Sequence, residues 1–138
     1  MKKIWLILSL LLATNLVVAA PIIIEPRDCI LYNALTAGSD RTSSAIDVSK
    51  MGHLSVQLKW ASLTGSIDGT FKIQVSTVPN PGSGDWVDKA GATFTLSGAT
   101  STNLINITII GERWARGVFT HTSISGGTIT GYCHAKSF

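Results

Sequence analysis

The stretch that decides the fold is HLSVQLKW, which runs from His53 to Trp60. Apolar and polar residues alternate strictly along it, and its apolar members are Leu54, Val56, Leu58 and Trp60. Because successive side chains of a strand point to opposite faces of a sheet, this alternation predicts a β-strand with one buried face and one wet face. We therefore expect the four apolar side chains to lie in the core.

The same period of two returns after a turn. In TFKIQVS, residues 70–76, the apolar positions are Phe71, Ile73 and Val75. The segment between the two stretches, residues 61–69, ends in Asp68-Gly69, a dipeptide typical of β-hairpins. This pattern predicts a hairpin turn between two strands.

Two later segments extend the pattern. In residues 101–111, Ile105, Ile107 and Ile109 share one face, whereas Leu104 and Ile110 fall on the other, which predicts a strand covered on both sides. The last strand is expected from residue 128, after a turn over residues 123–127. Its apolar face carries Ile129, Gly131, Cys133 and Ala135.

The succession of short strands and turns extends over residues 20–138. It contains about eight short candidate strands, spaced roughly 8 to 12 residues apart with turn residues between them, and no helical stripe. Such spacing is typical of an antiparallel β-sandwich. We predict one all-β domain over residues 20–138, a sandwich of the jelly-roll type.

The first 19 residues have the layout of a secretory signal peptide. Lys2 and Lys3 precede an apolar core, Ile4 to Leu12, and small residues follow up to Ala19. We expect cleavage after Ala19, with an uncleaved membrane anchor as the alternative. The mature protein would then be secreted, periplasmic or displayed at the cell surface, and would meet the membrane only through the signal peptide before cleavage.

An exported chain with two cysteines favours a disulfide. Cys29 and Cys133 are the only cysteines, one near each end of the expected domain. A bridge between them would close a loop of about 100 residues and stabilise the fold by up to about 4 to 5 kcal/mol. It requires the first and last strands to be neighbours or to face each other across the core. Two buried free thiols are the alternative.

The net charge of the chain limits the kinds of partner that we expect. The formal net charge is +3, and two of these positive charges are Lys2 and Lys3 of the expected signal peptide, so the rest of the chain is close to neutral. A nearly neutral chain gives no reason to expect a nucleic-acid partner.

The titratable residues predict neither a metal centre nor catalysis. His53, His121 and His134 lack the spacing of metal ligands, and the neighbours Cys133 and His134 point to opposite faces of a strand. No nucleophile motif singles out a serine. We expect no metal, no cofactor and no enzymatic activity.

Two segments are candidate binding elements. Trp86 follows a Gly-rich loop and is flanked by Asp85 and Asp88, so its ring could stack on a sugar between hydrogen-bonding groups. The alternative for Trp86 is that it starts a strand and caps the core. Asp85 and Asp88 could also bind calcium together with loop carbonyls, and the favoured alternative to such a site is a solvated loop. Near the start of the mature chain, Ile22, Ile23 and Ile24 form an apolar arm able to add to the sheet edge of a neighbour.

The chain resembles small β-sandwich proteins of phage virions and bacterial surfaces. The resemblance covers about half of the mature chain and rests on Gly69-Thr70, Gln74, Ser76, Trp86, the turn Ser125-Gly126-Gly127 and Lys136. It implies a non-enzymatic building block or attachment module.

Two functions follow from these observations. The first is an exported structural or assembly protein of an envelope-associated or extracellular particle or appendage, which associates with itself or with another particle protein. The alternative is a monomeric surface module that binds carbohydrate in the manner of an adhesin, through Trp86, Asp85 and Asp88.

Overall fold

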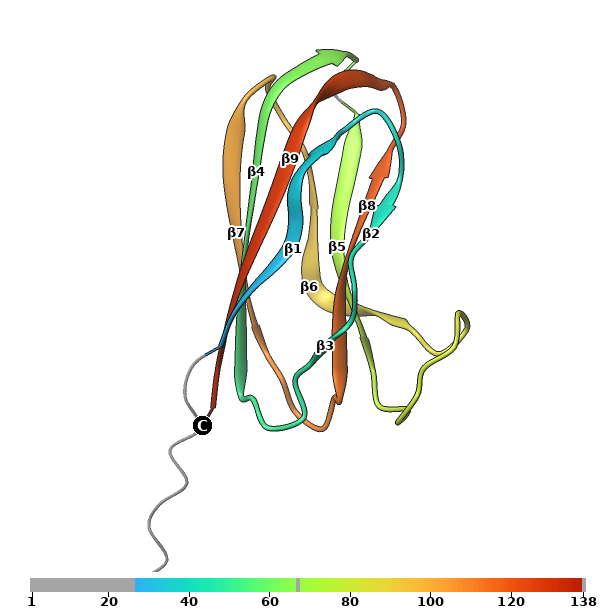
Figure 1. Cartoon of the computed structure of the whole chain (residues 1–138), viewed down its shortest axis with the longest axis vertical. Helices are drawn as coiled ribbons and strands as arrows, with labels where there is room; N and C mark the ends of the chain where they lie inside the picture. Colours follow the sequence, from blue (N-terminus) through green and yellow to red (C-terminus); the bar gives the residue numbers. More distant parts are fainter. Residues whose placement is uncertain (1–26, 67, 138) are drawn as a thin grey trace, which may run out of the picture.

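The computed structural model describes residues 27–66 and 68–137 and shows a β-sandwich in which no described residue is helical (Figure 1). The expected signal peptide, residues 1–19, and the expected arm, Ile22 to Ile24, lie outside the described residues. The strands are β1 (Arg27–Thr36), β2 (Arg41–Thr42), β3 (Ile46–Asp47), β4 (His53–Gly65), β5 (Gly69–Ser76), β6 (Val87–Thr95), β7 (Ser101–Thr108), β8 (Trp114–His121) and β9 (Ile124–Lys136).

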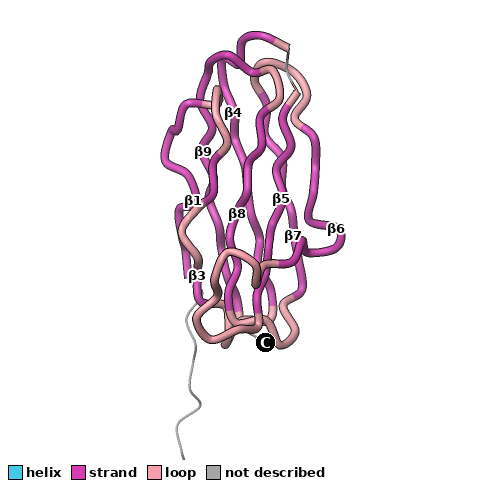
Figure 2. Tube along the Cα trace, turned by 90° about the vertical axis from the view of Figure 1, so that its right-hand side faces the viewer, coloured by secondary structure: helices cyan, strands magenta, loops and turns pink. Residues whose placement is uncertain are grey.

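Two antiparallel sheets form the sandwich. Sheet A has the strand order β1-β9-β4-β7, and sheet B has the order β2-β8-β5-β6, with β3 also paired to β8. The longer strands run along the length of the molecule (Figure 2). In this order the first strand lies beside the last, and the chain crosses repeatedly from one sheet to the other, as in a jelly roll. The predicted fold class is confirmed.

The alternation in residues 53–60 is confirmed by burial. Leu54, Val56, Leu58 and Trp60 of β4 are each no more than 4% exposed. Phe71 and Ile73 of β5 are buried equally deeply. The predicted hairpin between these two strands is wrong, however, because β4 belongs to sheet A and β5 to sheet B. Both strands direct apolar side chains into the same core from opposite sides, so the connection must cross the sandwich.

Two strand glycines make room for the largest core rings. A Cβ on Gly117 would lie 3.0 Å from the Phe71 ring, and a Cβ on Gly131 would lie 3.0 Å from the Tyr32 ring. Tyr32 and Phe71 meet edge to face, with ring centroids 6.1 Å apart. A glycine inside a strand often marks such a close approach. The two sheets are therefore joined by an aromatic contact seated on a glycine of each sheet.

A bulge in β1 turns Tyr32 inward. The register of β1 against β9 shifts between Ile30 and Tyr32, so these residues, two apart, lie on opposite faces of sheet A. Ile30 is 61% exposed, whereas Tyr32 is 1% exposed. The Tyr32 hydroxyl donates a hydrogen bond to the Arg41 carbonyl oxygen at 3.1 Å. Without the bulge, Ile30 and Tyr32 would lie on the same face of sheet A. Either the core would then lack the Tyr32 ring or the outer face would lack Ile30.

Other expectations need correction. Residues 124–127 belong to β9 rather than to a turn. The described residues form nine strands, in keeping with the expected number of about eight. Ile105, Ile107 and Ile109 are buried as predicted. Leu104 and Ile110 are 55% and 76% exposed, so the expectation that this strand is covered on both sides is wrong for the described part of the chain. The outer face of an edge strand meets solvent.

The disulfide joins the first and last strands. Cys29 and Cys133 are bonded, their Cα atoms are 4.9 Å apart, and they are register partners across β1 and β9. Cys133 is buried on the apolar face of β9, as its position in the alternation predicts. A disulfide is compatible with an extracellular protein. Among residues 27–66 and 68–137, no helix is long and apolar enough to cross a bilayer.

Candidate functional site

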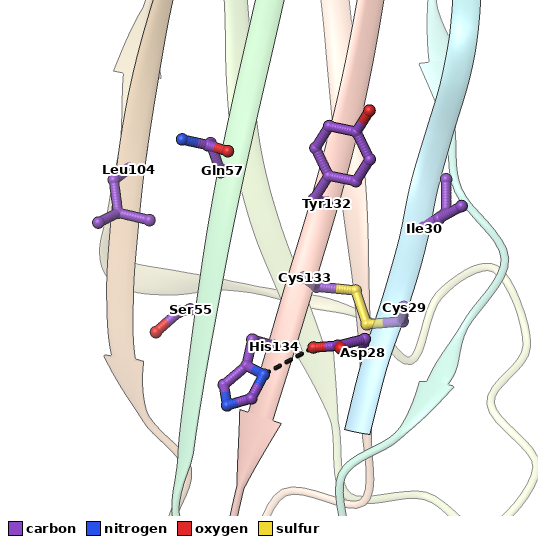
Figure 3. A pocket seen from close by; sticks show the side chains of 9 residues that line it. All are labelled: Asp28, Cys29, Ile30, Ser55, Gln57, Leu104, Tyr132, Cys133 and His134. Atoms are coloured by element: carbon purple, nitrogen blue, oxygen red, sulfur yellow. Dashed lines mark hydrogen bonds and ion pairs between the residues drawn. A yellow bond between two sulfur atoms is a disulfide. The ribbon is translucent and has the colours of Figure 1, made fainter. Parts of the chain in front are cut away.

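The outer face of sheet A carries a shallow groove of about 800 Å³. All four strands of the sheet contribute to it, and its side chains are shown in Figure 3. We call it the sheet A groove. It is lined by Asp28, Cys29, Ile30, Ser55, Gln57, Leu104, Tyr132, Cys133 and His134.

One row across the groove is polar. Asp28 pairs in register with His134, His134 with Ser55, and Ser55 with Asn106. The His134 Nδ1 lies 2.7 Å from Asp28 Oδ1, and the Ser55 hydroxyl donates to Asn106 Oδ1 at 2.7 Å. Asp, His and Ser are the residue types of a hydrolytic triad, but here the serine proton is directed to an amide oxygen, which does not act as a general base. The row therefore offers fixed hydrogen-bonding groups.

The next row is mainly apolar. Ile30, Tyr132, Gln57 and Leu104 are register partners across β1, β9, β4 and β7. Tyr132 is 44% exposed, and Ile30 and Leu104 are more exposed still. We call Ile30, Tyr132 and Leu104 the apolar row. Three large apolar side chains in one line on a solvent-facing sheet form a surface suited to contact with another molecule.

A second hollow lies beside sheet B. It has a volume of about 400 Å³ and is bounded by Trp86, Trp114, Ala45 and the loop residues Pro79, Asn80, Pro81 and Gly82. We call it the tryptophan hollow. The loop that contributes to it, residues 77–86, connects β5 to β6 and projects from the side of the sandwich in Figure 1.

Both tryptophan rings are held by polar contacts. The guanidinium carbon of Arg116 lies 4.1 Å from the Trp86 ring centroid. Arg116 in turn donates two hydrogen bonds to Gln74 Oε1, at 3.0 Å and 2.7 Å. The Trp114 indole Nε1 donates to the Pro79 carbonyl oxygen at 3.0 Å. The rings are thus oriented without a ligand.

The two carboxylates expected beside Trp86 have different partners. Asp85 Oδ2 accepts a hydrogen bond from the Gly82 amide at 2.7 Å and so closes the loop. Asp88 lies on β6, where it accepts hydrogen bonds from Lys72 Nζ and Gln74 Nε2, each at 2.8 Å. Asp88 therefore supports Trp86 indirectly, through Gln74 and Arg116, and does not line the tryptophan hollow.

Sequence reasoning did not identify Trp114, Gln74 and Arg116 as parts of this site. Gln74 and Arg116 are register partners on β5 and β8, so the outward positions of two neighbouring strands could have suggested their pairing. Trp114, at the start of β8, gave no comparable signal because its contact depends on the path of the loop over residues 77–86.

The pKa of Asp88 makes this network sensitive to acid. The hydrogen bond from Lys72, followed by that from Gln74, lowers the pKa of Asp88 below its ordinary value. The stabilisation from the hydrogen bonds of Lys72 and Gln74 to Asp88 is therefore fully present above the pKa of an unfolded aspartate, about 3.9. It is lost as the pH falls through the lower pKa that Asp88 has in the folded protein. We expect the fluorescence of Trp86 to change in that acid range, because Gln74 then loses the partner that orients it toward Arg116. The same titration of Asp88→Asn should lack this transition, and an unchanged transition would assign it to another carboxylate.

The described residues bring no metal ligands together. Within residues 27–66 and 68–137, no three His, Cys, Asp or Glu side chains are placed to hold a metal ion. His121 contacts Asp40, with Nδ1 2.9 Å from the Asp40 carboxylate, and His134 contacts Asp28. The absence of a cofactor and of catalysis remains a prediction.

Comparisons with known proteins bear on the fold alone. No protein-family model matches the chain, and neither does any characterised protein sequence. In structure the chain is similar to the crystal structure of the SPBc2 prophage-derived protein YomS, with a TM-score of 0.50 and 14% sequence identity. The similarity covers 81% of this chain and 94% of the YomS chain. The expected resemblance to phage proteins is thus supported at the level of the sandwich fold.

Proposed function

We propose that the protein is a non-enzymatic, exported structural protein that assembles with copies of itself into an envelope-associated or extracellular particle or appendage. The apolar row is the observation that carries this proposal. Ile30, Tyr132 and Leu104 are exposed on an ordered, disulfide-linked sheet, where burial against a partner would remove them from water.

The geometry of the row suits a second copy of the same chain. The row crosses sheet A from β1 to β7. Two copies can place their A sheets face to face, related by a two-fold axis that lies midway between the sheets and runs either parallel or perpendicular to the row. The apolar row of one copy then contacts the apolar row of the other. Gln57 and the neighbouring polar row would supply hydrogen bonds around the apolar contact.

The edges of the sandwich offer a second kind of contact. β7 lies at one edge of sheet A and β6 at one edge of sheet B. An edge strand can accept an added strand through backbone hydrogen bonds. We propose that the apolar arm Ile22 to Ile24 supplies such a strand. The jelly-roll fold, which occurs in viral capsid domains, and the similarity to a prophage-derived protein are consistent with a particle component.

The solution mass of the protein tests this proposal. The full chain is expressed, its intact mass is measured to test cleavage after Ala19, and its assembly is followed by size-exclusion chromatography with light scattering without reductant. We expect an oligomer, and we expect Ile30→Thr and Tyr132→Ser each to weaken association by about tenfold or more, since buried apolar anchors dominate interfaces.

Val87→Thr is the matched control for Ile30→Thr. Val87 is a β-branched residue that is 67% exposed on β6 of the other sheet. Its replacement likewise exchanges an apolar group for a hydroxyl, and it leaves both the apolar row and the backbone groups of the β6 edge in place. Deletion of residues 21–25 removes the arm and leaves the apolar row in place, so it distinguishes the contribution of the arm to association from that of the row. A monomer at every concentration in the unaltered protein would reject self-assembly.

A further inference from the structure

The tryptophan hollow is separate from the assembly face and has its own chemistry. It is bounded by Trp114 of sheet B, by Ala45 between β2 and β3 and by the loop over residues 77–86, whereas the apolar row lies on sheet A. All the residues that bound the hollow are uncharged. Its volume of about 400 Å³ falls near the lower end of the range of small-ligand sites. A hollow of this kind selects a small, neutral ligand.

The charged side chains nearest to the hollow do not line it. The Asp85 carboxylate accepts the Gly82 amide, and the Arg116 guanidinium is held by Gln74 beneath the ring of Trp86. A charged ligand in the hollow would therefore meet no countercharge among the residues that line it. This arrangement disfavours both anionic and cationic ligands.

The lining combines aromatic faces with an amide. Trp86 and Trp114 supply aromatic surface, Pro79 and Pro81 supply aliphatic ring surface, and the exposed Asn80 supplies one acceptor and two donors. Because the tryptophan rings are already oriented by Arg116 and by the Pro79 carbonyl, binding would cost little side-chain entropy. A pyranose ring matches this lining, since it has an apolar face of C–H groups and a rim of hydroxyls.

We propose that the tryptophan hollow binds a neutral saccharide, with Trp86 and Trp114 as stacking surfaces and Asn80 as the hydrogen-bonding residue. Asp88 acts here as a positioning residue through Gln74 and Arg116. The inference goes beyond the assembly proposal and does not depend on it, because the two surfaces share no residue.

Indole N–H signals in NMR spectra provide the test. The protein, labelled with ¹⁵N, is titrated with maltotriose, cellotriose, mannotriose and tri-N-acetylchitotriose, each up to about 10 mM, which would reveal even millimolar affinity. We expect at least one of these saccharides to shift the Trp86 and Trp114 signals. The signal of Trp60 should stay in place, because this indole is buried and donates to the Gly98 carbonyl oxygen at 3.0 Å.

Variants separate the hollow from the rest of the molecule. Trp86→Ala and Asn80→Ala should each weaken saccharide binding by about tenfold or more. Asn80 lies in an exposed loop, so Asn80→Ala keeps the test valid if Trp86→Ala fails to fold. Ile110→Ala is the control: it removes a side chain that is 76% exposed and lies outside both the hollow and the apolar row, and it should leave saccharide binding unchanged.

Three results would overturn the inference. The first is that none of the four saccharides shifts either indole signal. The second is that a polyproline peptide shifts both signals whereas the saccharides do not, which would assign the hollow to a proline-rich partner. The third is that Asn80→Ala and Trp86→Ala both fold and bind normally. None of these results depends on whether the protein assembles.

Discussion

Removal of the Cys29–Cys133 disulfide is expected to lower the free energy of unfolding by about 3 to 5 kcal/mol and the Tm by about 10 to 20 °C. The bridge spans 104 positions of the sequence, so the reduced unfolded chain gains much conformational freedom. The native strands lose little, because β1 and β9 remain paired by backbone hydrogen bonds on both sides of the bridge. The effect therefore arises mainly in the unfolded state.

Urea denaturation of Cys29→Ala/Cys133→Ala measures this effect. The double substitution avoids a lone thiol, which could form bridges between molecules. The unaltered protein in excess reductant should unfold at nearly the same urea concentration as the double variant. A difference of less than about 1 kcal/mol between the oxidised protein and the double variant would mean that the bridge contributes far less than chain entropy predicts.

Phe71→Ala is expected to cost about 3 to 5 kcal/mol of unfolding free energy. Phe71 is fully buried on β5, where its ring touches Tyr32 of sheet A and lies 5.5 Å, centroid to centroid, from the ring of Phe94. The cavity would be difficult to fill, because the strand position beneath the ring is Gly117, which has no side chain to move. Thermal and urea unfolding would measure the loss.

A second substitution at the same contact sharpens the test. Gly117→Ala alone should destabilise the protein by about 1 to 3 kcal/mol, because its Cβ would press on the Phe71 ring at 3.0 Å. In the Phe71→Ala background the same methyl group occupies vacated space, so its cost should shrink or reverse. Additive effects of the two substitutions would show that the ring and the glycine are not coupled.

The sequence predicts which face of a strand is buried better than it predicts how the strands are connected. Alternation identified the buried faces of β4, β5 and β9 because each strand has one wet face and one dry face. It could not tell that β4 and β5 belong to different sheets, since the same alternation suits a hairpin and a crossover. The bulge in β1 was also not predicted, because a register shift is set by the partner strand and by the space above Gly131.

The candidate sites show the same limit. Trp86 was predicted as a ligand-contacting residue and does bound a hollow, but Asp88 does not line it. The partners of Trp86 come from β5 and β8, about 10 and 30 residues away in the sequence, and pair only when the sheet forms. The sequence pattern placed Leu104 of the apolar row on the outward face of its strand. The alignment of Leu104 with Ile30 and Tyr132 was not predicted, because it depends on the register of four strands.

The bridge between the first and last strands has a mechanical consequence. β1 begins and β9 ends at the same end of the sandwich, and Cys29 and Cys133 lie only a few residues inside those ends (Figure 1). Tension applied to both ends would pass directly through the sulfur atoms, and the residues between them would carry none of it. Only after reduction could they extend, releasing about 350 Å of chain. While oxidised, each copy would act as a short, inextensible link whose folded body is shielded from pulling.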